Sequence, residues 1–368
     1  MSLVFYISGH GFGHASRSCQ LIGAVARRAP GLRLVVRTTV PEWFIRAGLD
    51  VPVEIVSGKT DTGVLQPDSL SIDDAGTAAR AAEFYRTFDS RVAREAAFLR
   101  EQRAVMVVAD IPPVAFAAAA AAGIPSVAVS NFTWDWIYSG FPTFDQLAPG
   151  VRARIAAANA QASLALRLPF AGGFDGMMHV EDVPLVARRA VLSRHETRAR
   201  LGIAEARPVV LATFGGHGGN IPLATAADNP AFRLVATDYE AGAATPSHPN
   251  LTVVSADAMR RAGVTYTDLL ASCDVVATKL GYGIVSECLA NRVALLYTLR
   301  RDFIEQEVFM REMPAVMRSR LIEPDDLREG RWAPAVEALL AQPVPANTVR
   351  LDGAEVAAER LMTLVPRH

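Results

Sequence analysis

Short apolar, β-branched runs alternate with amphipathic stretches along the first half of the chain. The runs are typical of strands buried in a parallel sheet, and the stretches between them have the periodicity of helices. We predict strands at 3–8, 33–38, 53–56, 105–109, 126–129 and 164–168, and helices at 15–29, 78–103, 114–122 and 151–163. This alternation predicts an α/β fold with a doubly wound parallel sheet.

The second half restarts the same alternation after a charged stretch at 188–201. We predict strands at 208–213, 233–237, 251–254, 275–278 and 294–298, and helices at 266–272, 283–290, 303–313 and 354–364. We therefore expect two Rossmann-like domains, 1–184 and 185–368, with a cleft between them. The last helix could pack back on the first domain.

Composition excludes several classes of protein. The 368 residues are 51% hydrophobic, which is enough for two cores, and the net charge of −1 gives no footprint for nucleic acid. No run approaches the roughly 20 apolar residues of a membrane span, and the N-terminus lacks the pattern of a signal peptide. The three cysteines have no metal or redox spacing. We expect a cytoplasmic protein without a nucleic-acid partner or a transmembrane segment.

Glycine-rich loops follow three of the predicted strands, at 9–14, 215–219 and 279–283. Glycine permits a sharp turn and a close approach to a ligand, and a helix that begins there directs free N–H groups at an anion. The first loop is one residue short of a dinucleotide fingerprint. Gly58-Lys59-Thr60 lacks the first glycine of a Walker loop, because Val53 stands there. Neither NAD nor ATP binding is predicted.

Three of the seven histidines, His10, His14 and His217, lie in these loops. For His10 and His217 we favour a structural role or a phosphate contact. For His14, at the junction of loop and helix, a general base and a structural role both stay open. No HExxH, DxD or cysteine cluster appears, so no metal site or cofactor is predicted.

Only two of the 37 basic residues are lysines, Lys59 and Lys279, and both lie in or beside glycine loops. They could have survived by chance in an arginine-rich chain. Alternatively, a compact ammonium is needed there as a point charge on phosphate or carboxylate.

Segments 214–219 and 273–287 resemble the nucleotide-binding half of GT-B glycosyltransferases, which consist of two Rossmann-like domains with the active site between them. The resemblance implies that the donor diphosphate lies at the helix start and that Glu287 binds the ribose. The donor-side residues implied or expected are Gly215, Gly216, His217, Gly218, Lys279, Gly281, Tyr282, Gly283 and Glu287. That family often has an Asp-Gln pair for the donor sugar, and Asp302 could replace it here with different spacing.

More narrowly, segments 7–17, 130–135 and 279–287 resemble the N-terminal, non-kinase region of plant L-arabinokinases and its stand-alone bacterial relatives. The sugar-kinase phosphate loop is absent, so kinase activity is not expected. We expect a metal-independent, inverting glycosyltransferase that uses a nucleotide-diphosphate sugar, with His14 as base and Asp135 as the next candidate. The expected first-domain contacts are His10, Gly11, Gly13, Lys59, Asn131 and Trp134.

Two other classes of function stay open. A sugar-nucleotide epimerase or hydrolase could use the same diphosphate site, but it would need extra carboxylates in the cleft and no acceptor pocket. A non-catalytic nucleotide-sugar sensor would keep Glu287 and the loop at 281–283 without a base.

Overall fold

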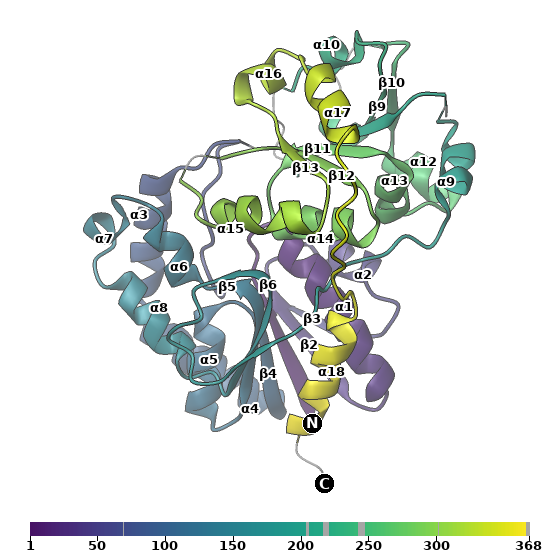
Figure 1. Ribbon diagram of the computed structural model, residues 1–368. Helices are drawn as coiled ribbons and strands as arrows, with labels where there is room; N and C mark the ends of the chain where they lie inside the picture. Colours follow the sequence, from purple (N-terminus) through teal and green to yellow (C-terminus); the bar gives the residue numbers. More distant parts are fainter. Residues whose placement is uncertain (69, 204–205, 216–220, 242–246, 301, 366–368) are drawn as a thin grey trace.

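Two parallel β-sheets flanked by helices form the chain, as seen in a computed structural model that describes residues 1–68, 70–203, 206–215, 221–241, 247–300 and 302–365. Within these residues the first sheet has seven strands in the order β3-β2-β1-β4-β5-β6-β7, and the second has six in the order β10-β9-β8-β11-β12-β13. Figure 1 shows the first half, in purple and blue, below most of the second half, in green and yellow; the yellow α18 lies beside the first half. The predicted α/β fold with two Rossmann-like halves is confirmed.

The strands of the first sheet are β1 (Ser2–Ile7), β2 (Arg33–Thr38), β3 (Glu54–Ser57), β4 (Ala104–Asp110), β5 (Ser126–Phe132), β6 (Leu164–Gly172) and β7 (Val180–Asp182). Those of the second are β8 (Val209–Ala212), β9 (Arg233–Thr237), β10 (Leu251–Val254), β11 (Val275–Lys279), β12 (Ala294–Thr298) and β13 (Ser319–Leu321). Every residue of β1, β5, β8 and β12 is buried, so their apolar residues follow one another, as in 127–129 of β5, instead of alternating with exposed polar residues.

The helices of the first half are α1 (Phe12–Arg28), α2 (Glu42–Ala47), α3 (Asp74–Arg86), α4 (Phe88–Glu101), α5 (Pro113–Ala122), α6 (Trp134–Ser139), α7 (Phe144–Leu147) and α8 (Val151–Asn159). Those that follow are α9 (Arg194–Leu201), α10 (Leu223–Ala227), α11 (Asp238–Ala241), α12 (Ala256–Ala262), α13 (Tyr266–Ser272), α14 (Tyr282–Ala290), α15 (Glu305–Glu312), α16 (Pro324–Arg328), α17 (Ala333–Leu340) and α18 (Gly353–Leu364). Among the described residues, none of these helices is long and apolar enough to cross a bilayer.

The single helix expected at 78–103 is wrong, because the chain breaks it into α3 and α4 at Thr87. The Thr87 hydroxyl donates to the Phe84 carbonyl oxygen at 3.2 Å, a local bond that competes with the helical ladder. The helix expected from residue 15 begins earlier, at Phe12, so His14 lies in its first turn. The short helices α6 and α7 were not predicted.

The two halves share buried contacts. One apolar cluster contains residues of both sheets, and the rings of Phe170 in β6 and Phe309 in α15 lie 5.3 Å apart. Helix α18 returns to the first half and packs on α1, as Figure 1 shows, where Arg27 and Arg28 pair with Glu355. The proposed domain limits at 184/185 stay a prediction.

Candidate functional site

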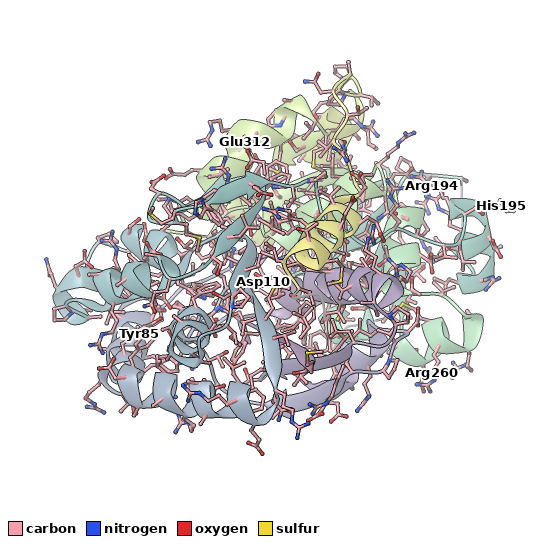
Figure 2. The ribbon with its side chains drawn as sticks, turned by 90° about the horizontal axis from the view of Figure 1, so that it is seen from below. Tyr85, Asp110, Arg194, His195, Arg260 and Glu312 are labelled. Atoms are coloured by element: carbon pink, nitrogen blue, oxygen red, sulfur yellow. The ribbon has the colours of Figure 1, made fainter. Side chains whose placement is uncertain are left out.

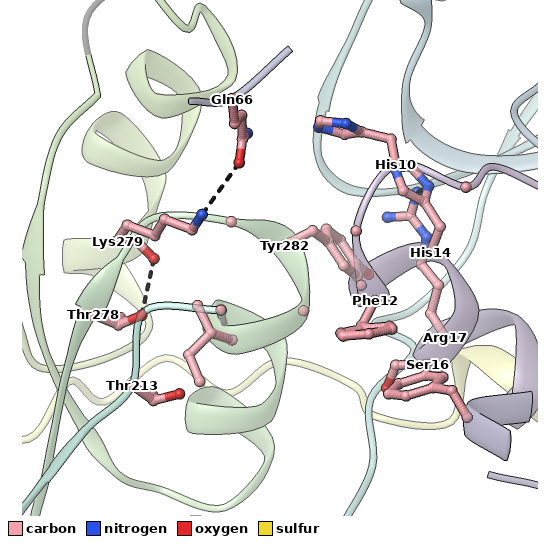
Figure 3. A pocket seen from close by; sticks show the side chains of 18 of the residues that line it. His10, Phe12, His14, Ser16, Arg17, Gln66, Thr213, Thr278, Lys279 and Tyr282 are labelled. Carbon is pink, nitrogen blue, oxygen red and sulfur yellow. Dashed lines mark hydrogen bonds between the residues drawn. The ribbon is translucent and has the colours of Figure 1, made fainter. Parts of the chain in front are cut away.

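A cavity of about 1200 Å³ lies between the two halves. Its walls come from the β1–α1 loop, the segment that follows β3, the β11–α14 loop and the segment that precedes α15. These segments follow the carboxyl ends of parallel strands, where open α/β sheets bind their ligands. Figure 3 shows residues of the first half, including His14, facing Lys279 and Thr278 of the second.

Helix α1 begins at the cavity through a glycine turn. Gly11, its N-cap residue, has a φ of 72°, a conformation that glycine adopts without strain. Gly11, Gly13 and His10 all line the cavity, as predicted from the loop. Val64 donates its backbone N–H to His10 Nδ1 at 3.2 Å, so His10 connects the loop to the segment that follows β3.

His14 pairs with a carboxylate that the sequence analysis missed. Its Nδ1 lies 2.9 Å from Oδ1 of Asp110, the last residue of β4, and both side chains are buried. Strand β4 neighbours β1 in the sheet, which places the two residues at the same edge. Figure 2 shows Asp110 in the interior of the molecule, whereas Arg194 and His195 lie at its periphery. The sequence signal that could have revealed Asp110 is a carboxylate directly after a predicted buried strand.

A buried arginine holds this carboxylate. Arg17 donates from Nη2 to Asp110 Oδ1 at 2.6 Å and from Nε to Oδ2 at 2.5 Å. Burial opposes ionisation of Asp110, but Arg17 and then His14 outweigh it, so the pKa of the Asp110 carboxyl is held well below its usual range. Asp110 is therefore an anion at neutral pH.

The network continues into the second half of the chain. Arg17 Nη1 donates to Asn131 Oδ1 at 2.6 Å, and Asn131 Nδ2 donates to Glu305 Oε1 at 2.8 Å. Glu305, the first residue of α15, lines the cavity. Burial raises its pKa, against the hydrogen bond from Asn131 and the charge of Arg300.

The opposite wall contains the start of α14 and a lysine. Gly281 is the N-cap residue of α14, and Tyr282 and Gly283 follow it along the cavity. Lys279 Nζ donates to Gln66 Oε1 at 3.3 Å, and a Cβ at Gly215 would lie 3.4 Å from Lys279 Cε. Burial, followed by the nearby charge of Arg300, lowers the pKa of Lys279 from 10.5 to about 7.

Glu287 lines the cavity, but it also has protein partners. Arg188, from the segment that joins the two sheets, donates to Glu287 Oε1 through Nε at 2.7 Å and Nη2 at 2.6 Å. The Ser16 hydroxyl donates to the same oxygen at 3.3 Å. Burial raises the pKa of Glu287, and Arg188 opposes the rise. Its expected contact with ribose stays a prediction.

Four expected site residues do not line the cavity. Trp134 is only 1% exposed and packs between the rings of His10 and Tyr138. Asn131 is buried behind the wall, and Asp135 accepts from Asn159 Nδ2 at 3.0 Å. Asp302 is exposed and outside the cavity wall. Lys59 is exposed and does line the cavity, whereas Gly216, His217 and Gly218 lie outside the described residues.

Besides Glu305, the cavity contains other groups that the sequence did not reveal. Asp61 accepts from Trp134 Nε1 at 3.0 Å, and burial raises its pKa against the bonds from Ser8 and Trp134. Phe12, Trp43 and Phe44 form an aromatic wall in which the first and last rings are stacked at 4.4 Å. In the described part of the chain, no three His, Cys, Asp or Glu side chains are grouped as metal ligands would be.

No family model matches the chain. Its structure is similar to the glycosyltransferase of kitacinnamycin, with a TM-score of 0.65, 19% identity and coverage of 99% of both chains. It is also similar to the glycosyltransferase VinC in complex with DTDP, with a TM-score of 0.61, 17% identity and coverage of 99% of this chain and 95% of that one. The chain therefore has the GT-B fold, as expected from the sequence.

A relative with a closer sequence is L-arabinokinase of Arabidopsis thaliana, 32% identical over 374 residues. The match covers 99% of this chain and 34% of L-arabinokinase, so the chain spans about a third of that relative's length. The similarity to L-arabinokinase expected from the motifs is thereby confirmed.

Proposed function

We propose that this chain is a glycosyltransferase that uses a nucleotide-diphosphate sugar, requires no metal ion or organic cofactor, and inverts the anomeric carbon. One observation carries the proposal. A single cavity has His14, which is paired with the buried Asp110 behind it, on one wall, and the start of α14 with Lys279 on the other. A base and an anion site that face each other are what glycosyl transfer from a diphosphate requires.

The donor diphosphate would lie at the N-terminus of α14, against Gly281, Tyr282 and Gly283. The free N–H groups and the helix dipole stabilise negative charge there, and Lys279 and Arg300 line the same cavity. These groups would stabilise the leaving diphosphate, and Glu287 would bind the ribose. The complex of VinC with DTDP supports a nucleotide diphosphate as the ligand of this fold.

His14 would remove the proton of the acceptor hydroxyl. His14 Nδ1 lies 2.9 Å from the Asp110 carboxylate and 3.1 Å from Arg17 Nη2. Because Nη2 donates its two hydrogens to Asp110 and Ser130, the carboxylate decides the tautomer and favours the proton on Nδ1, which leaves the Nε2 lone pair for the acceptor. Nε2 would take the proton while the acceptor oxygen attacks the anomeric carbon. The bond from that carbon to the diphosphate breaks, the nucleoside diphosphate leaves with the electron pair, and the configuration inverts.

A two-stage experiment tests the proposal. A thermal-shift screen with nucleoside diphosphates and their sugars comes first, because a ligand at about a hundred times its Kd stabilises by roughly 2.7 kcal/mol. The ligands found are then incubated with and without hydroxyl acceptors. Release of nucleoside diphosphate that requires an acceptor, and that falls at least about a hundredfold in Asp110→Asn, supports the proposal. Binding without any turnover would instead indicate a sensor.

A second candidate is a nucleotide-sugar epimerase or hydrolase, because Asp61 and Glu305 add two carboxylates to the cavity. Such an enzyme would act on the nucleotide sugar without an acceptor. Isomerised sugar in the protein-only reaction would establish an epimerase, and acceptor-independent release of nucleoside diphosphate would establish a hydrolase.

A further inference from the structure

The side chains that hold the proposed base are themselves held by the second half of the chain. Arg17 keeps Asp110 in place, and Asp110 orients the His14 ring. Three contacts connect this group to the donor-side half, through Asn131, through the Arg17 guanidinium and through Gly13. Each of them involves a different residue of the second half.

The first contact fixes an amide. Asn131 Oδ1 accepts from Arg17 Nη1 at 2.6 Å, and its Nδ2 donates to Glu305 Oε1 at 2.8 Å and, at a longer 3.4 Å, to the Phe170 carbonyl oxygen. If the amide flipped, its NH₂ group would face the guanidinium and its oxygen would face the carboxylate and the carbonyl, so all three hydrogen bonds would be lost. Glu305, which accepts the shorter of the two Nδ2 bonds, therefore helps to fix which atom of Asn131 faces Arg17.

The second contact places the Arg17 guanidinium over an aromatic ring. The Arg17 Cζ atom lies 4.7 Å from the centre of the Tyr282 ring, a distance at which a cation is attracted to an aromatic face. Arg17 is buried, with edge contacts to Asp110, Asn131 and Ser130. The ring of Tyr282, at the start of α14, thus lies against the guanidinium that holds the carboxylate.

The third contact is a close approach of two helix starts. A Cβ on Gly283 would lie 3.2 Å from the Gly13 Cα atom, and a Cβ on Gly13 would lie 3.7 Å from the Gly283 nitrogen. Gly13 immediately precedes His14. The position of the first turn of α1 is therefore set directly by the first turn of α14.

We propose that Asn131, Arg17 and Glu305 are positioning residues for the base, and that His14 adopts its productive ring state only when the donor-side half is in contact with the first. The role of these residues in catalysis rests on the proposed function, in which His14 is the base. The ring state of His14 can be measured without any reaction.

The test is the nitrogen NMR spectrum of the histidines in the ligand-free full-length chain, at alkaline pH, with His14→Gln to assign the signal among the seven histidines. In the wild type we expect one tautomer of His14, with the proton on Nδ1. In Asn131→Leu, which removes the hydrogen bonds of the amide to both Arg17 and Glu305, we expect averaging between the two tautomers. Glu305→Ala should give the same result from the other half, and Glu305→Gln, which can still accept from Asn131, should restore the single tautomer.

Glu355→Gln is the matched control, because Glu355 anchors the far end of α1 without touching the network. Its His14 spectrum should equal that of the wild type. A single tautomer in both Asn131→Leu and Glu305→Ala would overturn the proposal, and so would an equal change in Glu355→Gln. Should Asn131→Leu fail to fold, Glu305→Ala and Glu305→Gln decide the question.

Kinetics add a readout that depends on the proposed function. With an active donor and acceptor, Asn131→Leu should lower kcat by roughly 10- to 100-fold with little change in the donor KM, because it misplaces the base and leaves the diphosphate site intact. A rise in donor KM with unchanged kcat would contradict the positioning role. If no transfer activity exists, the proposed function fails while the NMR result still stands.

Discussion

Strands β4 and β11 occupy corresponding places in the two sheets, each beside the first strand of its own half, and they end in opposite charges. Asp110 at the end of β4 is paired with Arg17 and His14, and its pKa is lowered. Lys279 at the end of β11 has no ion-pair partner among the described residues, and burial lowers its pKa to about 7.

The difference indicates two tasks on one scaffold. In the first half, the charge of Asp110 is compensated by Arg17, and this pairing holds the His14 ring in one orientation. The second half keeps a cation and a set of helix N–H groups available to a ligand. We therefore expect substitutions in the first half to lower stability and turnover, and substitutions in the second half to lower nucleotide affinity.

The largest effect is expected at Trp134, in the packed wall behind His14. Trp134→Ala removes a buried ring that also donates to Asp61, so unfolding free energy should fall by about 3–5 kcal/mol, measured by denaturant or thermal unfolding. Trp43→Ala is the control, because Trp43 is 64% exposed and its loss should change stability by less than about 0.5 kcal/mol. Equal stability of the two variants would contradict a packed first-half wall.

His14→Ala should lower turnover by about a hundredfold or more, the usual scale for a lost general base, while nucleotide affinity stays nearly constant. Steady-state kinetics and calorimetry with the same nucleotide sugar measure the two quantities. His10→Ala should be milder, because His10 connects loops. Loss of nucleotide binding in His14→Ala would make His14 a phosphate contact. It would contradict the assignment of the base to the first half and of nucleotide binding to the second.

Glu287→Ala should lower nucleotide affinity at least about tenfold, since a hydrogen bond to a charged group contributes roughly 1.5–3 kcal/mol. Calorimetry measures the affinity, and thermal unfolding is recorded in parallel because Arg188 loses its partner. Lower stability with unchanged affinity would show that Glu287 serves only the ion pair with Arg188.

The smallest effect is expected from pH. Lys279 is charged below its pKa of about 7 and neutral above it, so the affinity for a nucleotide sugar should fall severalfold as pH rises through 7. A nucleotide sugar is preferred to the free diphosphate, because its diphosphate does not titrate in this range. In Lys279→Arg the pH dependence should disappear. An equally steep dependence in that variant would assign it to another group.

The sequence was informative where local pattern decides the structure. Buried parallel strands form continuous β-branched runs, so β2, β9, β10 and β12 were predicted at the bounds that the structure gives them. The loop before α1 was also predictable from local sequence, because its glycines include Gly11, whose positive φ glycine adopts without strain. Helix ends were less accurate, because side-chain bonds such as that of Thr87 decide them.

The site was less predictable because its partners are distant in sequence. Asp110 and His14 are 96 residues apart, and Asn131 and Glu305 are 174 apart, so no local spacing connects them. The motif led to Asp302 alone, whereas Glu305, the first residue of α15, is the carboxylate that lines the cavity. The burial of Trp134 likewise depends on helices packed around it.

The scarcity of lysine has a practical consequence for chemistry on this protein. Lys59 and Lys279 are the only lysines in the chain, and both face the cavity. Amine-directed reagents would therefore modify lysine side chains only there, and the lowered pKa of Lys279 leaves part of its amine deprotonated near neutral pH. A fluorophore or cross-linker could thus be placed in the cavity of the unmutated chain, and a bound ligand could be detected by the protection of one amine.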